Sequence, residues 1–153
     1  MLKLLHYNKD LHLEYLKKWL GDEKLMAGWD MPPFWGHVAE EWTEEKNKVI
    51  LMIFHPKLNK IIGFVNFYDW NKTTHIVSRG TLIDPEFQGK GFGKKAIKLS
   101  NKYAFEKMHV KRIELYVAEA NTISRHITEK LGYTFDRYDS KKKRFHYYMD
   151  INS

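Results

Sequence analysis

The chain contains no cysteine, which excludes disulfide bonds and any mechanism that passes an acyl group through a cysteine thiolate. Long hydrophobic runs are missing as well. The longest uncharged apolar run, at 49–54, has six residues, whereas a transmembrane helix needs about 20. Charged residues interrupt the N-terminal stretch in which a signal peptide would carry its apolar core. We therefore expect a protein that works in the cytoplasm and binds no membrane.

Acidic residues are outnumbered by basic ones, and the net charge at pH 7 is +7. Such an excess raises the question of a nucleic-acid partner. The basic residues are spread along the chain, however, and no nucleic-acid-binding motif accompanies them. Their densest cluster, at 141–144, is typical of an exposed hairpin tip. We expect no nucleic-acid partner, and no pattern in the sequence predicts a metal site.

The length and composition favour one compact unit. The chain has 153 residues, of which 43% are hydrophobic and 15% aromatic, enough for one domain with a buried core. No internal repeat, low-complexity tract or linker divides it. We therefore expect a single domain over residues 1–153, present as a monomer or a homodimer.

Hydrophobic periodicity and turn residues predict the order of helices and strands. Because a helix crosses between the runs at 74–83 and 112–117, these two strands should be parallel. The segment 28–36, rich in Pro, Gly and aromatic residues, is typical of a structured loop. The order βααβββαβαββ predicts an α+β fold, a mixed sheet with helices on both faces. We expect strands at 2–6, 49–54, 61–68, 74–83, 112–117, 134–139 and 144–151, and helices at 11–20, 37–47, 92–108 and 121–131.

Residues 83–93 carry the strongest functional signal in the chain. An apolar strand ends before Pro85, and Gly89, Gly91 and Gly93 then open a helix. Glycines at such a junction permit positive φ angles and a close approach of the backbone to a ligand. The first helical amides lack an intrahelical acceptor and point toward an anion, and lysines at 90, 94 and 95 add positive charge. The segment therefore predicts a pyrophosphate-binding loop.

The spacing of the glycines distinguishes among the known phosphate loops. The P-loop pattern G-x-x-x-x-G-K-[ST] is absent, and Lys94 stands where the dinucleotide fingerprint requires its third glycine. The run Gln88-Gly89-Lys90-Gly91-Phe92-Gly93 instead resembles the Q/R-x-x-G-x-G/A signature of the GCN5-related N-acetyltransferases (GNAT). About thirty residues downstream, the segment 121–133 is similar to the family's second signature, N-x-x-[AS]-x-x-x-[YF]-E-K-L-G-[FY]. The resemblance extends over residues 60–150.

The resemblance implies the GNAT acyl-CoA N-acyltransferase fold and the transfer of an acetyl group from acetyl-coenzyme A (acetyl-CoA) to a primary amine in one ternary complex. The most similar branch contains ribosomal-protein N-terminal acetyltransferases and small-amine acetyltransferases. The acceptor therefore stays open among a protein N-terminus, a polyamine, an aminoglycoside and another small amine.

The same resemblance assigns roles within the coenzyme site. Backbone amides of the loop are expected to hold the pyrophosphate, and an amide at Leu82 or Ile83 is expected to stabilise the thioester oxyanion. Asn121 is expected to hydrogen-bond the pantetheine arm. The expected coenzyme-binding residues are Leu82, Ile83, Gln88, Gly89, Lys90, Gly91, Phe92, Gly93, Lys94 and Asn121.

Two positions depart from the family's catalytic pattern. Thr128 stands where the family frequently has a general-acid tyrosine, and Ser78 stands where many members have a glutamate. We expect Ser124, one helical turn after Asn121, to act at the sulfur of the leaving thiolate in place of the tyrosine. The general base stays open among His75, Asp69, Asp84, Glu119 and a water chain to solvent.

The acceptor side of the site is expected in the N-terminal third, which forms that side of the cleft in the family. Acidic residues crowd the expected helix at 37–47, and aromatic residues crowd the loop before it. An acidic and aromatic rim attracts a cationic amine. The expected acceptor-binding residues are Trp29, Trp35, Glu41 and Glu44.

Two other functions are compatible with parts of the sequence. A non-catalytic acyl-CoA-binding regulatory module would keep the glycine loop and lose catalysis, which Thr128 and Ser78 allow. A dinucleotide-binding oxidoreductase fragment would share the strand, the glycine-rich turn and the helix. That alternative lacks the third glycine and needs a second mononucleotide-binding half, for which 153 residues leave little room.

Overall fold

One mixed sheet organises the molecule. The computed structural model describes residues 1–29, 31–34 and 37–152, and within them seven strands lie in the order β1-β2-β3-β4-β5-β7-β6. The strands are β1 (Lys3–His6), β2 (Val49–His55), β3 (Lys60–Asn71), β4 (Ile76–Ile83), β5 (Arg112–Ala118), β6 (Thr134–Asp139) and β7 (Arg144–Asp150). The α+β class expected from the sequence is confirmed.

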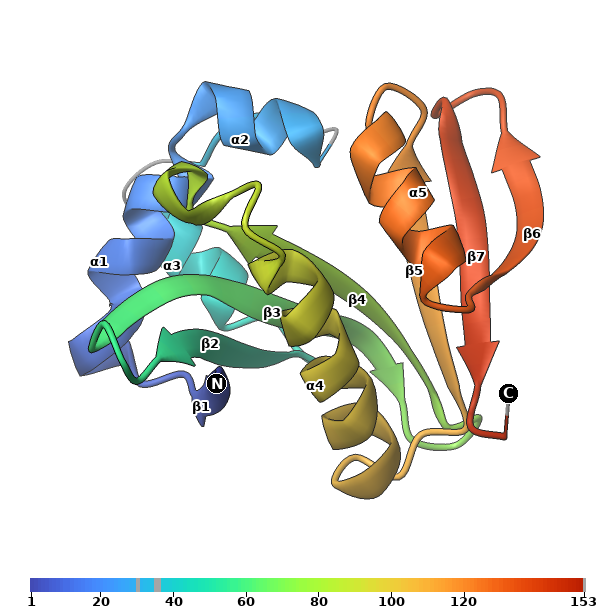
Figure 1. The fold of residues 1–153 in the computed structure, drawn as a ribbon, viewed down its shortest axis with the longest axis horizontal. Coiled ribbons are helices and arrows are strands. Elements are labelled where there is room, and N and C mark those ends of the chain that lie inside the picture. Colours follow the sequence, from blue (N-terminus) through green and yellow to red (C-terminus); the bar gives the residue numbers. More distant parts are fainter. Residues whose placement is uncertain (30, 35–36, 153) are drawn as a thin grey trace.

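The centre of the sheet is its weakest junction. All neighbouring strands are antiparallel except β4 and β5, which are parallel as predicted because a helix crosses between them. Residue partners between β4 and β5 extend only from Ile76–Arg112 to Ser78–Glu114. Figure 1 shows the two strands together at one end and well apart at the other. The last five residues of β4 therefore have no strand partner on the β5 side.

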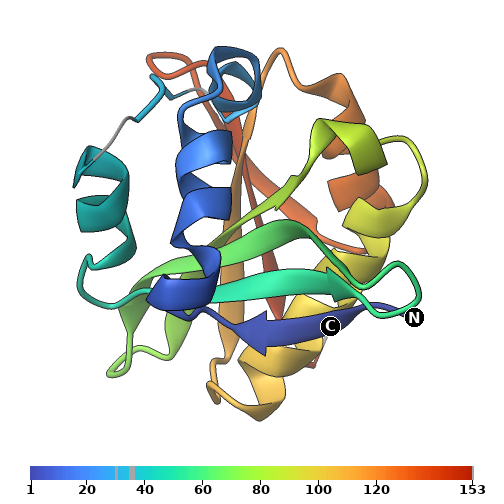
Figure 2. The same ribbon diagram turned by 90° about the vertical axis from the view of Figure 1, so that its left-hand side faces the viewer.

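Helices cover both faces of the sheet, as expected (Figure 2). On one face, Trp19, Met26 and Trp42 pack with Phe64 of β3 in a cluster beneath the N-terminal helices. On the other face a larger cluster, which includes Ile113 and Tyr147, lies beneath the two C-terminal helices. The helices are α1 (Lys9–Leu20), α2 (Glu23–Gly28), α3 (His37–Thr43), α4 (Phe92–Glu106) and α5 (Thr122–Lys130), with a 3-10 turn η1 (Pro85–Phe87) before α4.

Two N-terminal elements differ from the sequence-based expectation. Helix α2 was not expected; its N-cap is Asp22, whose carboxylate accepts hydrogen bonds from the amides of Lys24 and Leu25. Helix α3 ends at Thr43, whereas the sequence predicted an end at 47. The Thr43 hydroxyl donates to the carbonyl of Glu40 at 2.6 Å at this helix end. Among the described residues, no helix is long and apolar enough to span a bilayer.

Candidate active site

A cavity of about 820 Å³ opens where β4 and β5 separate. From the α4 side it is lined by the glycine loop, by α4 and by the start of α5. From the α1 side it is lined by the end of α2, the segment after α3, and residues of β3 and β5. The opening between the two strands thus joins two walls that lie on opposite faces of the sheet.

The glycine loop has the backbone geometry that a close ligand requires. Gly89 and Gly91 have φ angles of 77° and 82°, in the left-handed region that disfavours side chains. A Cβ atom placed on either residue would meet no atom within 4 Å, so the backbone at both positions borders open space. Gly93 has no such φ, and its Cβ would lie 3.7 Å from Ile83, an ordinary contact.

Side chains on both flanks hold this loop in place. The Gln88 side-chain amide donates to the Ile83 carbonyl at 2.9 Å. Asp84 accepts from the amide of Glu86 and from the Trp19 indole N–H, both at 2.8 Å. The loop is therefore tied to the end of β4 and to α1 independently of any ligand.

The start of α4 suits an anion. Gly91 is the N-cap and supplies no side-chain hydrogen bond, so the first amides of the helix are left for another acceptor. The first turn contains no acidic residue, and Lys94 lines the cavity beside it. Free amides at the positive end of a helix, together with an ammonium group, fit a pyrophosphate. The residues present therefore fit the coenzyme that the sequence implies.

The start of α5 forms the neighbouring wall. The Asn121 side chain caps the helix by accepting from the amide of Ser124 at 3.0 Å, and it donates to the Gly28 carbonyl of α2 at 3.4 Å. Ser124 lines the cavity, and its carbonyl accepts the Thr128 hydroxyl at 2.8 Å. Thr128 is 3% exposed. Its hydroxyl proton is engaged by this backbone acceptor, so Thr128 does not replace the tyrosine of the family pattern.

The opposite wall is aromatic and charged. Trp29 lies against Gly80 and donates from its indole to the Thr81 carbonyl at 3.3 Å. The Lys48 ammonium lies 3.4 Å from the centre of the Trp42 ring and 2.9 Å from Glu45. Burial lowers the pKa of Lys48, and the Glu45 carboxylate opposes that shift.

Tyr68, on the same wall, also lines the cavity. Burial raises its pKa to about 12, so its hydroxyl stays protonated at neutral pH.

Most of the expected site residues meet at this cavity. Leu82 packs instead in the core beneath the N-terminal helices, and the Lys90 ammonium lies 5.7 Å from the Phe87 ring, outside the lining. Trp35 lies outside the described residues. The expected residues that line the cavity are Trp29, Ile83, Gln88, Gly89, Gly91, Phe92, Gly93, Lys94, Asn121 and Ser124.

The structure places Glu41 and Glu44, the expected acidic rim, outside the lining of this cavity. Glu44 instead lies 3.8 Å from the Lys9 ammonium at the start of α1. Because α3 ends at Thr43, the following residues turn inward and Glu45 reaches the cavity in their place.

Of the four residues considered as general base, Asp69 lines the cavity. Asp84 is engaged by Trp19 and the loop, and Glu119 accepts the Tyr138 hydroxyl at 3.0 Å. His75 lies in the connection before β4, with a φ of 61°. Of these four, Asp69 is therefore the one within reach of the cavity, where solvent and the lining carboxylate of Glu45 are further proton acceptors.

Several lining residues were not anticipated from the sequence, among them Arg79, Tyr116 and Arg144. Arg79 had a signal, since an arginine interrupts the β-rich run 76–83. Tyr116 and Arg144 had none, because neither belongs to a functional motif in the sequence.

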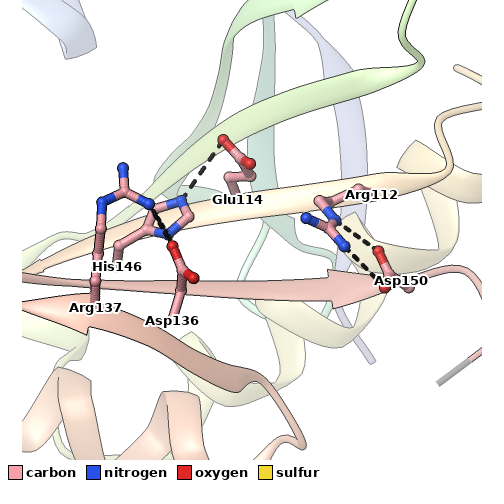
Figure 3. Close-up of polar contacts among 6 residues, drawn as sticks. All are labelled: Arg112, Glu114, Asp136, Arg137, His146 and Asp150. Carbon is pink, nitrogen blue, oxygen red and sulfur yellow. Dashed lines mark hydrogen bonds and ion pairs between the residues drawn. The ribbon is translucent and has the colours of Figure 1, made fainter.

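A polar cluster lies beside the cavity on β5, β6 and β7 (Figure 3). His146 is buried between Asp136, 2.7 Å from its Nδ1, and Glu114, 3.6 Å from its Nε2. The hydrogen bond from His146 is the main cause of a lowered pKa of Asp136. Glu114 is the register partner of Ser78, but it does not line the cavity. In the described part of the chain, no His, Asp or Glu cluster is arranged to hold a metal ion.

Comparison with known families gives a match over most of the chain. A family model described as acetyltransferase (GNAT) domain matches residues 2–134. Spermidine N(1)-acetyltransferase from Escherichia coli K12 is 31% identical over 74 residues, which cover 48% of this chain and 40% of that protein. The aligned part thus spans less than half the length of that relative.

Solved structures match over nearly the whole chain. A spermidine N-acetyltransferase from Vibrio cholerae, solved in complex with CoA and spermine, superposes with a TM-score of 0.92 at 20% identity, covering 99% of this chain and 96% of that one. A dodecameric structure of spermidine N-acetyltransferase from the same organism gives a TM-score of 0.79 at 19% identity, covering 97% and 93%. At this level of identity the likeness concerns the fold.

Proposed function

The chain belongs to the acetyltransferase (GNAT) domain family, and we propose on that basis that it transfers the acetyl group of acetyl-CoA to the primary amine of a small acceptor. Polyamines are the first candidates, because spermidine acetyltransferases appear among the relatives in both sequence and structure. The dinucleotide-binding oxidoreductase alternative is excluded by the family.

The coenzyme half of the site is the α4 side of the cavity. We propose that the amides of the loop and of the first turn of α4 hold the pyrophosphate, with Lys94 as a counter-charge. Expected contacts through the backbone also include Leu82 and Lys90, whose side chains point elsewhere. If Asn121 is to hydrogen-bond the pantetheine arm, its long 3.4 Å bond to the Gly28 carbonyl must be exchanged for that contact.

The acceptor half is the α1 side. Aromatic rings of Trp29, Trp42 and Tyr68 line it, with carboxylates from Glu45 and Asp69. A cationic amine is attracted both to the carboxylates and to the faces of the rings. Lys48 and Arg144 line the same wall, so their positive charges neutralise part of the negative charge of the carboxylates.

The chemistry has three requirements, each with a candidate group. The ammonium must lose a proton before its nitrogen attacks, and Asp69 or solvent accepts it. The thioester oxygen becomes negative and needs an N–H, which the Ile83 amide can supply, since the amides of a strand alternate between its two edges and that of Asp84 donates to Ile62 of β3. The departing thiolate gains a hydrogen bond from Ser124. Holding both reactants in one cavity supplies a large part of the rate by itself.

The single observation that carries this proposal is the continuity of the cavity across the sheet. A wall suited to pyrophosphate and a wall suited to a cationic amine meet through the opening between β4 and β5. Two sites on separate surfaces would not allow direct transfer.

The test is thiol release from acetyl-CoA against a panel of amines: spermidine, spermine, an aminoglycoside and a peptide with a free N-terminus. We expect turnover with at least one acceptor and formation of the acetylated amine by mass spectrometry. Binding of acetyl-CoA without turnover of any amine would favour the non-catalytic module, and absence of binding would refute both.

A paired substitution tests the acceptor wall. Glu45→Gln removes a carboxylate that lines the cavity, whereas Glu41→Gln changes an exposed carboxylate that does not line it. We expect KM for a cationic acceptor to rise for Glu45→Gln alone, with the affinity for CoA unchanged. Equal KM values for the two variants would refute the acidic wall.

We also propose a monomer or homodimer working in the cytoplasm. Light scattering after gel filtration tests the assembly, and a dodecamer, as named for one relative, would contradict it. Cell fractionation tests the compartment.

A further inference from the structure

Arg79 is a buried cation in the coenzyme half of the cavity. It is 4% exposed and lines the cavity near the middle of β4. Side chains of a strand alternate between its faces, so Arg79 shares the α4 face with Thr81 and Ile83. Ile97 of α4, Leu115 of β5 and Thr128 of α5 line the same part of the cavity without charge.

The guanidinium is held by neutral groups. Its Nη1 donates to the Ser100 hydroxyl at 3.1 Å and to the Asn101 side-chain oxygen, and the Tyr133 ring lies 5.4 Å away. Among the described residues, no carboxylate lies within 4.0 Å of Arg79, and its buried Nε has no hydrogen-bond partner. The positive charge is therefore oriented but not neutralised.

A second unpaired atom belongs to the same face of β4. The Thr81 hydroxyl oxygen is buried and also lacks a partner among the described residues. Burying a charge and a hydroxyl without partners costs free energy, and native interiors avoid both unless a ligand completes them. Two such atoms on one face of β4, both in a cavity lining, indicate a missing anionic group with hydrogen-bond acceptors.

The location connects this anion with the acyl donor. Arg79 precedes Thr81 by two residues, which is a displacement of about 6.6 Å along the strand. Arg79 is therefore farther than Thr81 from the glycine loop, which follows the end of β4. The proposed oxyanion amide at Ile83 lies on the other side of Thr81. A carboxylate separated from the thioester carbon by two methylene groups extends about 5 Å beyond it. That length brings the carboxylate toward the part of β4 whose side chains Arg79 and Thr81 line the cavity.

We propose that the enzyme also accepts acyl-CoA donors whose acyl group ends in a carboxylate, such as succinyl-CoA, and that Arg79 and Thr81 bind this carboxylate. The inference rests on the proposed function of the same cavity. The amine nitrogen bonds to the thioester carbon, the carbon–sulfur bond breaks, and the proton lost by the amine balances the thiolate. The distal carboxylate is unchanged, and no further reactant is needed.

The test compares donors with a common amine acceptor. Succinyl-CoA carries the carboxylate, and butyryl-CoA is a neutral donor of the same chain length. For the wild-type enzyme we expect kcat/KM with succinyl-CoA to exceed that with butyryl-CoA by roughly tenfold or more, the value of one charge-assisted hydrogen bond. Butyryl-CoA used as well as succinyl-CoA would overturn the proposal, with no variant required.

Substitutions then assign the effect to the residues. Arg79→Met is expected to lower the succinyl-to-butyryl ratio by roughly tenfold to a hundredfold, and Arg79→Lys to restore part of it. Thr81→Val should lower the ratio less. Arg112→Met is the matched control, since Arg112 pairs with Asp150 outside the cavity lining and should leave the ratio unchanged.

Other outcomes separate this inference from the proposed function. Turnover of acetyl-CoA without turnover of succinyl-CoA refutes the carboxylate site alone. No turnover of any donor refutes the proposed function. If Arg79→Met weakens free CoA as much as succinyl-CoA, Arg79 binds the coenzyme arm and the proposal fails. If Arg79→Met does not fold, the proposal is tested by the succinyl-to-butyryl ratio of the wild-type enzyme and by the lowering of that ratio in Thr81→Val.

Discussion

The residues that most clearly separate a ligand-binding role from a folding role are the glycines of the loop. Gly89 and Gly91 have positive φ and border open space, whereas Gly93 has neither property. The fold alone therefore tolerates a side chain at 93 more readily than at 91. The positive φ of Gly91 is a requirement of the fold. The absence of a side chain at Gly91 lets a ligand reach the amides at the start of α4.

Gly91→Val is expected to weaken CoA binding by well over tenfold, roughly 1.4 kcal/mol or more, because a branched side chain enters the space in front of the amides. Isothermal titration measures the effect, and circular dichroism checks that the fold is kept. Gly93→Ala is the matched control and should change affinity far less. Equal losses in the two variants would mean that the helix start, rather than access at Gly91, controls binding.

Ser124→Ala is expected to lower kcat by roughly tenfold to a thousandfold if the hydroxyl acts at the leaving sulfur. Its amide keeps the hydrogen bond to Asn121, so CoA affinity and melting temperature should hardly move. Thr122→Ala removes an exposed hydroxyl from the same helix and serves as control. Wild-type kcat for Ser124→Ala would refute the assignment and leave solvent as the proton donor.

Residues of the coenzyme side could be anticipated because they belong to contiguous motifs, in which spacing determines geometry. The sequence could not show that Glu41 and Glu44 lie away from the cavity, because its pattern does not reveal that the helix ends at Thr43 instead of 47. Glu45 lines the cavity for that reason. Arg79 and Thr81 needed the packed structure, because a missing partner is not visible in a sequence.

Among the elements, the contact of β3 with the end of β4 bears directly on the site. Gly63 of β3 is the register partner of Ile83, and a Cβ on Gly63 would lie 2.1 Å from the Leu82 carbonyl oxygen. No rotamer relieves a clash with backbone, so a side chain at 63 must displace β4. The strand end that carries the proposed oxyanion amide is therefore positioned by the absence of a side chain on its neighbour.

Gly63→Ala is expected to destabilise the protein by about 1–3 kcal/mol, as overpacking typically does, and to lower kcat because β4 shifts at Leu82 and Ile83. Gly28→Ala is the control, since its Cβ would meet nothing within 4 Å. Chemical denaturation gives the free energy of unfolding. A Gly63→Ala variant with unchanged stability and kcat would show that β4 accommodates the methyl group without moving.

The sequence predicted all seven strands of the described structure and the helices α1, α3, α4 and α5, with α3 running to 47 instead of Thr43. Helix α2 escaped because six residues give too little periodicity, although Asp22 after Gly21 is a recognisable start signal. The position of β7 between β5 and β6 also escaped, because a hairpin pattern does not say which of its strands joins the sheet.

At the scale of the whole molecule, acid should destabilise the fold. Hydrogen bonds from His146 and Arg112 are the main causes of lowered pKa values of Asp136 and Asp150, and the amide of Lys142 does the same for Asp139. A lowered folded pKa stabilises the protein fully above the unfolded value of about 3.9. That contribution is lost as the pH falls through the lower folded pKa.

The melting temperature is therefore expected to fall steadily from pH 5 to below pH 3, as measured by calorimetry. Asp150→Asn should flatten part of this decline, because the side chain that pairs with Arg112 then has no carboxylate to titrate. A melting temperature independent of pH over this range would contradict the expected linkage.

The short ladder between β4 and β5 also has a dynamic consequence. Three residue pairs join the two strands, whereas seven join β5 to β7, so local opening should be easiest at this central junction. A ligand that bridges the opening then holds the two half-sheets together. We expect saturating CoA to slow amide hydrogen exchange in β5 and β7 as well as in the loop, as seen by mass spectrometry. Protection confined to residues 83–94 would contradict this expectation, because it would mean that the junction between β4 and β5 does not open more readily than the rest of the sheet when the site is empty.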